Sequence, residues 1–309
     1  MRLQAAGLIL ALALATGCSI KRVAVDRIGN ALAEGSGVYA SDDDPELVRD
    51  ATPFALKSIE GLLEQSPSHQ GLLLAACSGF TRYAHAFVQD EADYTEARDL
   101  ARATELRARA KKLYLRARGF GLRGLEAGLP GFRDQLRSDP GAALARARVQ
   151  DVPLLYYTAA SWAAAFALDI TDASLSVDQG LMEKLIRRAL ALDEGWDQGA
   201  LHEFLVAWEA GHAQAGGSTA QARQHFEAAV RLSGGRRASV YVTYAEAVAL
   251  EAQDRPAFEG LLKTAAALDP DRDPARRTAT LVAQRRARWL LSRLDELFNE
   301  PDPPTEKTP

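Results

Sequence analysis

The sequence contains few cysteines, few aromatic residues and no stretch that alternates as a half-buried strand does. Only two of its 309 residues are cysteines, and aromatic residues make up 7% of the chain. Since Cys18 lies at a predicted modification site, Cys77 would remain without a disulfide partner. Cys77 lies in the apolar run LLLAACSGF, where a free cysteine packs as a small hydrophobe rather than acting as a reactive thiol. The composition predicts an all-α protein without disulfides.

A basic surplus and catalytic signatures are also missing. The formal net charge is −4 and becomes −5 when Arg2 is lost with a signal peptide, which argues against a nucleic-acid partner. The stretch HEFLV begins at His202, but Val206 replaces the second histidine of an H-E-x-x-H zinc motif. No G-x-S-x-G nucleophile motif occurs, and GGSTAQ lacks the lysine of a phosphate loop, so that Ser218 or Thr219 more simply caps the next helix. We therefore expect no metal, no cofactor and no enzymatic activity.

The N-terminus resembles a bacterial lipoprotein signal. Arg2 is the only charge before Lys21, and the apolar stretch between them is shorter than the about 20 residues of a membrane-spanning helix. Small residues precede Cys18 in LATGC, as in the lipobox, whose cysteine is acylated and becomes the mature N-terminus. The alternative is an ordinary secretory signal in which Cys18 is incidental. We predict a signal peptide over residues 1–17, lipidation of Cys18 and a lead-in segment over residues 18–40.

Lipidation would place the protein at a membrane surface outside the cytoplasm. Acyl chains contribute about 0.8 kcal/mol per buried CH₂, so a multiply acylated terminus binds a bilayer firmly. Ser19 follows the cysteine, whereas an Asp there would by resemblance favour the inner membrane. The predicted location is the periplasmic side of a bacterial membrane, with the outer membrane favoured.

Helix signals recur along the rest of the chain. One spacing pattern occurs five times. It consists of a small residue, a large residue four positions later, and a small or apolar residue three positions after that. This pattern resembles the second helix of a tetratricopeptide unit. The last two intervals, 40 and 35 residues, bracket the ~34-residue period of that repeat, and the earlier intervals of 55 and 72 require inserted helices. The five occurrences are Ala55–Ile59–Leu62, Ala110–Tyr114–Ala117, Met182–Ile186–Ala189, Ala222–Phe226–Ala229 and Ala257–Leu261–Thr264.

The pattern predicts a tetratricopeptide-like helical-hairpin array, an α-solenoid with inserted helices, over residues 41–299. An irregular α-bundle is the alternative. The tail over residues 300–309 is rich in proline and lacks apolar residues, so we expect it to be disordered. Further helices are expected over residues 69–90, 94–126, 151–170, 196–214, 237–253 and 275–299, with loops over 127–140, 171–178, 214–218 and 269–274.

Two aromatic stretches are candidates for a ligand-binding cleft. In LLYYTAASWAAAF, Trp162 belongs to an apolar helical stripe, while Tyr156 and Tyr157 lie off it and need hydroxyl partners if they are buried. In WDQGALHEFLVAWEAGH, Trp208 lies on the core stripe and His202 flanks it. Polar aromatic residues beside a core face suit the concave wall of a solenoid, although core packing alone explains most of them.

A basic amphipathic segment runs from Arg98 to Arg123. Its apolar positions recur at spacings of four and three, so the basic residues lie on the opposite, solvated face. The alternative to a merely solvated face is a docking surface for an acidic partner or anionic lipid headgroups. The docking candidates are Arg107, Lys111, Arg116 and Arg118.

Several long blocks resemble the TatT family, the tetratricopeptide-like T component of tripartite ATP-independent periplasmic (TRAP) transporters. The resemblance covers residues 18 to 299. The blocks occur in the family's order and are DDDPELVRDATPFALKSIEGLLEQSPSHQGLLLAACSGFTRYAHAFV, KKLYLRARGFGLRGLE, DVPLLYYTAASWAAAFALD and RRALALDEGWDQGALHEF.

The resemblance implies a lipid-tethered all-α body that assembles as a homotrimer, with a cleft or pore in each protomer. The implied partner is the periplasmic solute-binding P component, and the implied ligand is a small, partly hydrophobic organic molecule. The implied function is capture of that ligand and its handover to the partner. A tetratricopeptide scaffold lipoprotein for cell-envelope assembly is the alternative.

Overall fold

The computed structural model describes residues 36–212 and 217–298. The predicted signal peptide, Cys18 and the predicted tail lie outside these described residues. Within them every regular element is a helix, which confirms the predicted all-α class. The described chain divides into two compact units: unit 1 comprises residues 36–39 and 46–192, and unit 2 comprises 40–45 and the described residues from 193 onward.

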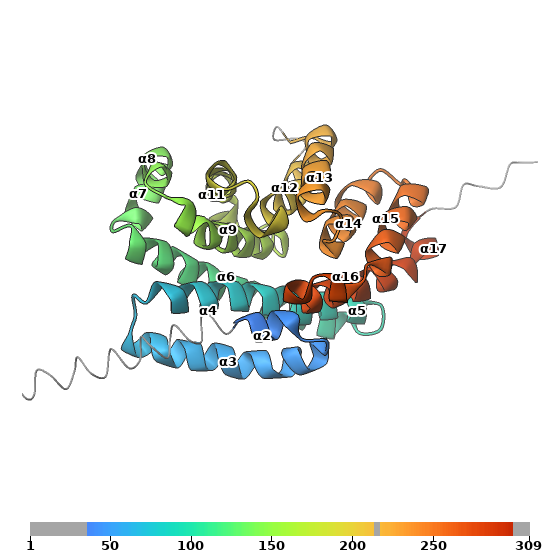
Figure 1. Ribbon diagram of the computed structural model, residues 1–309, viewed down its shortest axis with the longest axis horizontal. Coiled ribbons are helices and arrows are strands. Elements are labelled where there is room, and N and C mark those ends of the chain that lie inside the picture. Colours follow the sequence, from blue (N-terminus) through green and yellow to red (C-terminus); the bar gives the residue numbers. More distant parts are fainter. Residues whose placement is uncertain (1–35, 213–216, 299–309) are drawn as a thin grey trace, which may run out of the picture. The chain divides into compact units, whose positions relative to one another are not determined.

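Unit 1 is built around three mutually packed helices, α4, α6 and α9, with α11 packed on α9 (Figure 1). The sequence order leads from α2, which crosses the boundary between the units, to α11. The elements are α2 (Ser36–Ser41), α3 (Pro45–Gln65), α4 (Gln70–Ala84), the π-helix η1 (His85–Gln89), α5 (Asp90–Glu96), α6 (Leu100–Gly128), α7 (Phe132–Ser138), α8 (Pro140–Ala145), η2 (Val149–Asp151), α9 (Val152–Ala167), α10 (Ala173–Ser176) and α11 (Gln179–Leu192).

Glycines on α6 allow the three central helices to approach closely. A Cβ atom added at Gly121 would lie 2.9 Å from Cys77 Sγ and would also collide with Thr158. Cys77 is buried as predicted, and burial raises the pKa of its thiol, so the thiol stays protonated and unreactive. At Gly124 an added Cβ would lie 2.6 Å from Leu154 Cδ2. The core of unit 1 therefore depends on the absence of side chains at these two positions.

The predicted loop over residues 127–140 is wrong over most of its length. It contains α7 and the first residue of α8. Asp139 accepts a hydrogen bond from Ala142 N at 3.0 Å, and Pro140 occupies the first turn of α8. Turn-forming residues in this stretch thus cap a short helix instead of forming an extended loop.

Unit 2 contains a row of helices in which α12 packs on α13, α14 on α15, and α15 on α16 (Figure 1). Of the two predicted capping residues, Ser218 caps α13, because its hydroxyl accepts from Gln221 N at 3.1 Å. The elements are η3 (Trp196–Gln198), α12 (Ala200–Gly211), α13 (Thr219–Ser233), α14 (Ala238–Tyr244), the π-helix η5 (Ala245–Ala249), α15 (Arg255–Ala267), η6 (Pro270–Arg272), η7 (Pro274–Arg276), α16 (Arg277–Leu291) and α17 (Leu294–Leu297).

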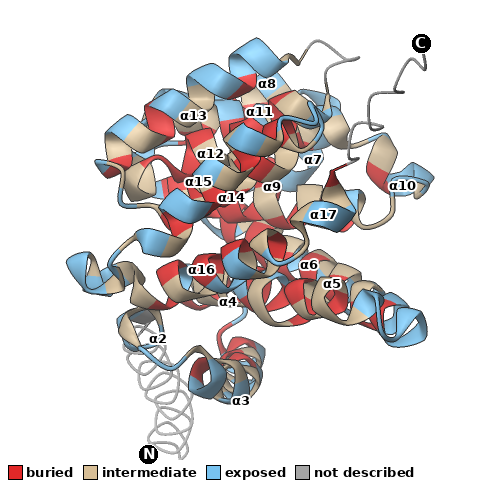
Figure 2. Cartoon of the chain, turned by 90° about the vertical axis from the view of Figure 1, so that its right-hand side faces the viewer, coloured by how far each residue is buried: buried red, intermediate tan, exposed pale blue. Residues whose placement is uncertain are grey.

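The helices bury one side and expose the other (Figure 2), but the predicted stripe was not correct in every helix. On α11 the predicted residues Met182, Ile186 and Ala189 are all fully buried. On α15 the stripe is shifted by one position, and the predicted Thr264 is exposed. The larger apolar residues have more surface to remove from water, so they decide which side of α15 faces the core. The buried residues of α15 are Phe258, Leu262 and Ala265.

Among the described residues, no helix combines the length and apolarity needed to cross a membrane. The all-α array is confirmed. The assignment of its hairpins to tetratricopeptide repeats remains a prediction.

Candidate functional site

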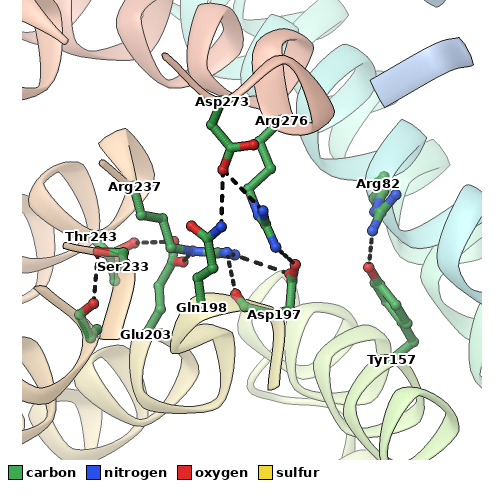
Figure 3. Close-up of polar contacts among 11 residues, drawn as sticks. Arg82, Tyr157, Asp197, Gln198, Glu203, Ser233, Arg237, Thr243, Asp273 and Arg276 are labelled. Atoms are coloured by element: carbon green, nitrogen blue, oxygen red, sulfur yellow. Dashed lines mark hydrogen bonds and ion pairs between the residues drawn. The ribbon is translucent and has the colours of Figure 1, made fainter. Parts of the chain in front are cut away.

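In unit 1, α9 brings the two predicted tyrosines into direct contact. Their rings pack edge to face, with centroids 4.9 Å apart and planes at 76°. Tyr157 is buried and Tyr156 is half-buried. Arg82 of α4 donates a hydrogen bond from Nη2 to Tyr157 Oη, and its guanidinium carbon lies 5.2 Å from the centre of the same ring (Figure 3). The predicted need for a hydroxyl partner at Tyr157 is met by an arginine from a neighbouring helix.

Trp162, the third candidate on α9, contacts Arg118, which we predicted as a docking residue. The guanidinium carbon of Arg118 lies 4.8 Å from the centre of the Trp162 ring. Trp162 is 4% exposed, and its Nε1 is buried without a hydrogen-bond partner. Arg118 Nε is buried without a partner as well, and burial lowers the pKa of Arg118. The structure therefore joins a predicted ligand residue with a predicted docking residue.

The other three docking candidates form ion pairs within unit 1. Each pair connects α6 with a carboxylate on another segment, which local sequence spacing does not reveal. Internal carboxylates therefore already neutralise these charges. The pairs are Arg107–Asp93 at 2.9 Å, Arg107–Glu96 at 2.8 Å, Lys111–Asp169 at 2.7 Å, Lys111–Asp172 at 2.8 Å and Arg116–Glu60.

In unit 2, His202 lies within a short chain of polar groups. Its Nδ1 is 2.8 Å from Nδ1 of His225, and its Nε2 is 3.1 Å from Oε1 of Glu194. One imidazole must donate and the other accept, so a single proton is shared between the two Nδ1 atoms. His202 is 5% exposed, and burial lowers its pKa while the Glu194 carboxylate opposes that shift. In the part of the chain that the structure describes, no three His, Cys, Asp or Glu side chains are grouped to hold a metal ion.

Trp208, the second candidate on α12, lies in the middle of an aromatic stack. Its ring stacks on Phe204 with centroids 5.8 Å apart, and on His212 with centroids 4.0 Å apart. The three residues are spaced by four along the helix, which places them on one face. The sequence analysis missed Phe204 and His212, although their spacing from Trp208 was a usable signal.

A charged cluster beside α12 was not predicted. Asp197, Gln198 and Gly199 all have positive φ angles, of 47°, 56° and 91°. Left-handed backbone costs a non-glycine residue roughly 1–2 kcal/mol, so two such residues in sequence require compensating contacts. Arg237 supplies one, donating from Nη1 to the carbonyl oxygen of Asp197 at 2.9 Å. Arg276 supplies another through an ion pair with the Asp197 side chain (Figure 3).

The same cluster extends to two further carboxylates. Arg237 also pairs with Glu203, and both side chains are 14% exposed. Gln198 Nε2 donates to Asp273 Oδ2 at 3.0 Å, and Asp273 pairs with Arg276 at 3.0 Å (Figure 3). We name Asp197, Glu203, Arg237, Asp273 and Arg276 the charged cluster. Its two arginines pair with all three carboxylates, so the cluster holds the strained turn in place.

Comparison with known proteins places the chain in a family. The model of the family described as the TRAP transporter T-component, TAtT, matches residues 41–298. An uncharacterized protein of Treponema pallidum (strain Nichols) is 31% identical over 304 residues, which cover 92% of this chain and 94% of the relative. This chain belongs to the TRAP transporter T-component family.

The T-component match confirms the resemblance to the TatT family. It spans every described helix from α3 onward, so α9 with its tyrosines and α12 with Trp208 both lie inside the matched region. Membership makes the protein an accessory component of a TRAP transport system. The roles of individual residues remain predictions.

Proposed function

We propose that this T component is a lipid-anchored periplasmic protein that binds the solute-binding P component and hands it a small, partly hydrophobic organic ligand. The match of residues 41–298 to a family of transporter components carries the proposal. The lipobox-like sequence before Cys18 supports anchoring. The aromatic contacts of α9 and α12 support an organic ligand, because stacked rings offer apolar faces with a few polar groups.

Anchoring and weak binding would work together in such a handover. A lipid tether confines the protein near the membrane and raises its effective concentration for other envelope components. A protein that passes a ligand on must also release it, so we expect weak affinity for the ligand and fast exchange. A homotrimer would present three copies of the ligand site around one partner assembly.

The proposed docking surface for the P component is the basic face of α6. Three of its four candidates, Arg107, Lys111 and Arg116, would have to exchange internal carboxylates for acidic residues of the partner. Arg116 is exposed, so exchange of its partner changes the free energy little, by about 0–1 kcal/mol, whereas the half-buried Arg107 and Lys111 exchange theirs less readily. This surface would therefore set orientation and association rate rather than affinity.

Binding to the P component is the direct test. Full-length protein extracted in detergent would be mixed with a TRAP solute-binding P protein from the same organism, and the mass of the complex followed by native mass spectrometry. We expect a complex that contains both proteins, with the T component as a trimer. An unrelated solute-binding protein is the control. No complex at high micromolar concentrations would contradict handover.

The anchor has a separate test. Mass spectrometry of the mature N-terminal peptide should show Cys18 as the first residue, carrying acyl chains. A mature chain that begins elsewhere and contains an unmodified Cys18 thiol would contradict anchoring but not partner binding.

A further inference from the structure

A row of cations runs along one side of α6. Arg109, Arg116 and Arg123 follow one another at intervals of seven residues, and Lys112 lies between the first two. Seven residues make about two turns of an α-helix, so these side chains lie above one another on the same side. We name the four the basic row. At a rise of about 1.5 Å per residue, the basic row extends over roughly 21 Å.

Each arginine of the basic row lies over an aromatic ring that is buried in unit 1. A ring attracts the flat face of a guanidinium, and the N–H groups on the edge of the guanidinium remain able to bind an anion. The rings therefore position the row for contact with anionic groups outside the protein. The contacts, measured from the guanidinium carbon to the ring centre, are Arg109–Tyr83 at 5.8 Å, Arg116–Phe80 at 5.2 Å and Arg123–Phe120 at 5.4 Å.

Internal partners leave most of the hydrogen-bonding capacity of the basic row unused. Arg109 Nη2 donates to Tyr83 Oη at 3.4 Å, and Arg123 Nη2 donates to the carbonyl oxygen of Pro67 at 3.0 Å. A guanidinium carries several N–H donors, so each of these arginines keeps others available. Apart from Arg116, which pairs with Glu60 and is 46% exposed, no member of the row forms an ion pair within the described residues. One carboxylate thus serves four cations.

We propose that the basic row binds the anionic headgroups of a phospholipid membrane. The proposal rests on the lipid anchor of the proposed function and adds a second contact with the membrane, which decides the side of unit 1 that faces the bilayer. Phosphate oxygens of the headgroups accept hydrogen bonds from guanidinium and ammonium groups. Each Lys or Arg near an anionic membrane surface strengthens binding by about fivefold.

The composition of the surface favours lipid headgroups over an acidic protein. Protein interfaces depend on a central group of aromatic and other large apolar side chains. Of the exposed large apolar side chains in the described part of the chain, only Leu100 belongs to α6, and it is the first residue of that helix. Headgroups need no such apolar centre, because they present charge over a wide area.

The predicted anchor keeps the basic row within reach of a bilayer. Cys18 lies 18 positions before Ser36, the first described residue, and an extended chain of that length spans at most about 60 Å. Confinement to such a distance raises the effective concentration for a weak membrane contact. Of the docking candidates only Arg116 belongs to the row, whereas Arg107 and Lys111 lie on the opposite side of α6. Partner docking on that side and the membrane contact can therefore occur together.

A thiol placed within the row can report this contact. Gly119 lies three residues after Arg116 and four before Arg123, so it is on the same side of α6. It is exposed, and an added Cβ meets nothing within 4 Å, so Gly119→Cys can carry a fluorophore. Cys77 is buried and stays unlabelled. Protein without Gly119→Cys, treated with the same dye, measures any labelling of Cys18.

Fluorescence quenching by lipid headgroups then measures the approach of the row to the membrane. Full-length labelled protein would be mixed with liposomes of phosphatidylcholine alone or of phosphatidylcholine with phosphatidylglycerol, both containing a lipid with a nitroxide on its headgroup. We expect quenching by the anionic liposomes and little quenching by the neutral ones. Sodium chloride at about 1 M should reverse the quenching, because the Debye length falls to about 3 Å.

Two double variants of equal charge test whether the cations of the row cause the quenching. Arg109→Gln with Lys112→Gln removes two cations that have no carboxylate partner within the described residues. It should lower the ratio of membrane-contacting to free protein by about 25-fold. Arg137→Gln with Lys184→Gln is the control, because it removes the same charge from exposed positions on α7 and α11. It should change the ratio less than about twofold. Thermal denaturation shows whether both variants keep their fold.

The outcomes separate the membrane contact from the anchor and from partner docking. Quenching that requires anionic lipid and the row cations supports the contact, whether the protein floats with both kinds of liposome or only with the anionic kind. Flotation with the anionic kind alone refutes the anchor and leaves the contact supported. Equal quenching by both kinds of liposome, equal quenching in the two double variants, or none at all overturns the contact. Loss of P-component binding in the row variant, without lipid dependence, overturns it too and assigns the row to the protein partner.

Discussion

Both units contain arginine–carboxylate pairs, but they differ in the arginines that lie on aromatic rings. In unit 1, Arg82 and Arg118 lie on the faces of Tyr157 and Trp162. In unit 2, the arginines of the charged cluster bind carboxylates, and even Arg286, which lies 4.6 Å from the centre of the Trp289 ring, also pairs with Glu246. An aromatic ring attracts a guanidinium but accepts little of its hydrogen-bonding capacity, whereas a carboxylate occupies its donors. Arg118, which lies on a ring and forms no ion pair within the described residues, therefore keeps donors that the paired arginines use.

The largest effect should come from removing an arginine of the charged cluster. Arg237→Gln leaves Glu203 without its cation and removes one of the two arginine contacts to the strained turn at Asp197, and breaking a largely buried ion pair is costly. We expect the free energy of unfolding of unit 2 to fall by about 2–4 kcal/mol. Hydrogen exchange followed by mass spectrometry would measure the loss in peptides of α12 and α14.

The control for that change is an exposed pair in the same unit. Arg223→Gln removes the partner of Glu227 on the surface of α13, where both side chains are more than half exposed. We expect a loss below about 0.5 kcal/mol. Equal losses for Arg237→Gln and Arg223→Gln would show that the charged cluster has no structural role.

Close helix packing in unit 1 should give the next largest effect. A methyl group at Gly121 would press on Thr158 and Cys77, so Gly121→Ala should lower the free energy of unfolding by about 1–3 kcal/mol. Gly119→Ala is the control, because an added Cβ there meets nothing within 4 Å and should stabilise α6 by about 0.5–1 kcal/mol. Thermal denaturation of both variants checks the sign of each change. Destabilisation by both substitutions would contradict the packing argument.

Lowering the pH should destabilise unit 2 through His202. Burial lowers the pKa of this residue below that of an unfolded histidine, about 6.5, so the unfolded chain binds the proton more readily. The stabilisation is complete above about pH 6.5 and is lost as the pH falls from there toward the folded-state pKa. Hydrogen-exchange protection factors in α12 and α13, which correct for the slower intrinsic exchange at low pH, should therefore fall below about pH 6.5. His202→Gln should flatten this dependence, and an unchanged profile in that variant would assign it to another group.

The smallest effect should come from one hydroxyl in unit 1. Tyr157→Phe removes the acceptor for Arg82 but keeps the ring beneath the guanidinium, so the loss should be about 0.5–1.5 kcal/mol. A double-mutant cycle with Arg82→Gln isolates the contact, and we expect a coupling of about 0.5 kcal/mol because Arg82 is exposed. A coupling as large as the loss for Arg237→Gln would remove the contrast between the two units.

Local features of the fold could be predicted because they repeat along the chain. The buried residues of α11, the Ser218 cap of α13 and the buried Cys77 all follow from neighbours within one or two helical turns. The prediction was wrong where two candidate stripes compete, as on α15, because the choice depends on the surface that the helix meets. It was also wrong for the segment that contains α7 and α8, where turn residues serve as helix caps.

Some features of the candidate site could likewise be predicted from the sequence, and others could not. Sequence patterns singled out Trp162 and Arg118, but as members of unrelated groups, and they gave no indication that Arg107 or Lys111 would be neutralised internally. The strained turn at Asp197 had no local signal either, since aspartate and glutamine rarely adopt positive φ angles without outside support.

By itself the sequence determined the all-α class, the apolar setting of Cys77 and the family, because periodicity, local composition and ordered blocks are properties of the chain alone. Only the tertiary structure decided which arginines keep free donors. Whether a guanidinium meets a ring or a carboxylate depends on helices far apart in the sequence that pack side by side, and no local pattern encodes that meeting.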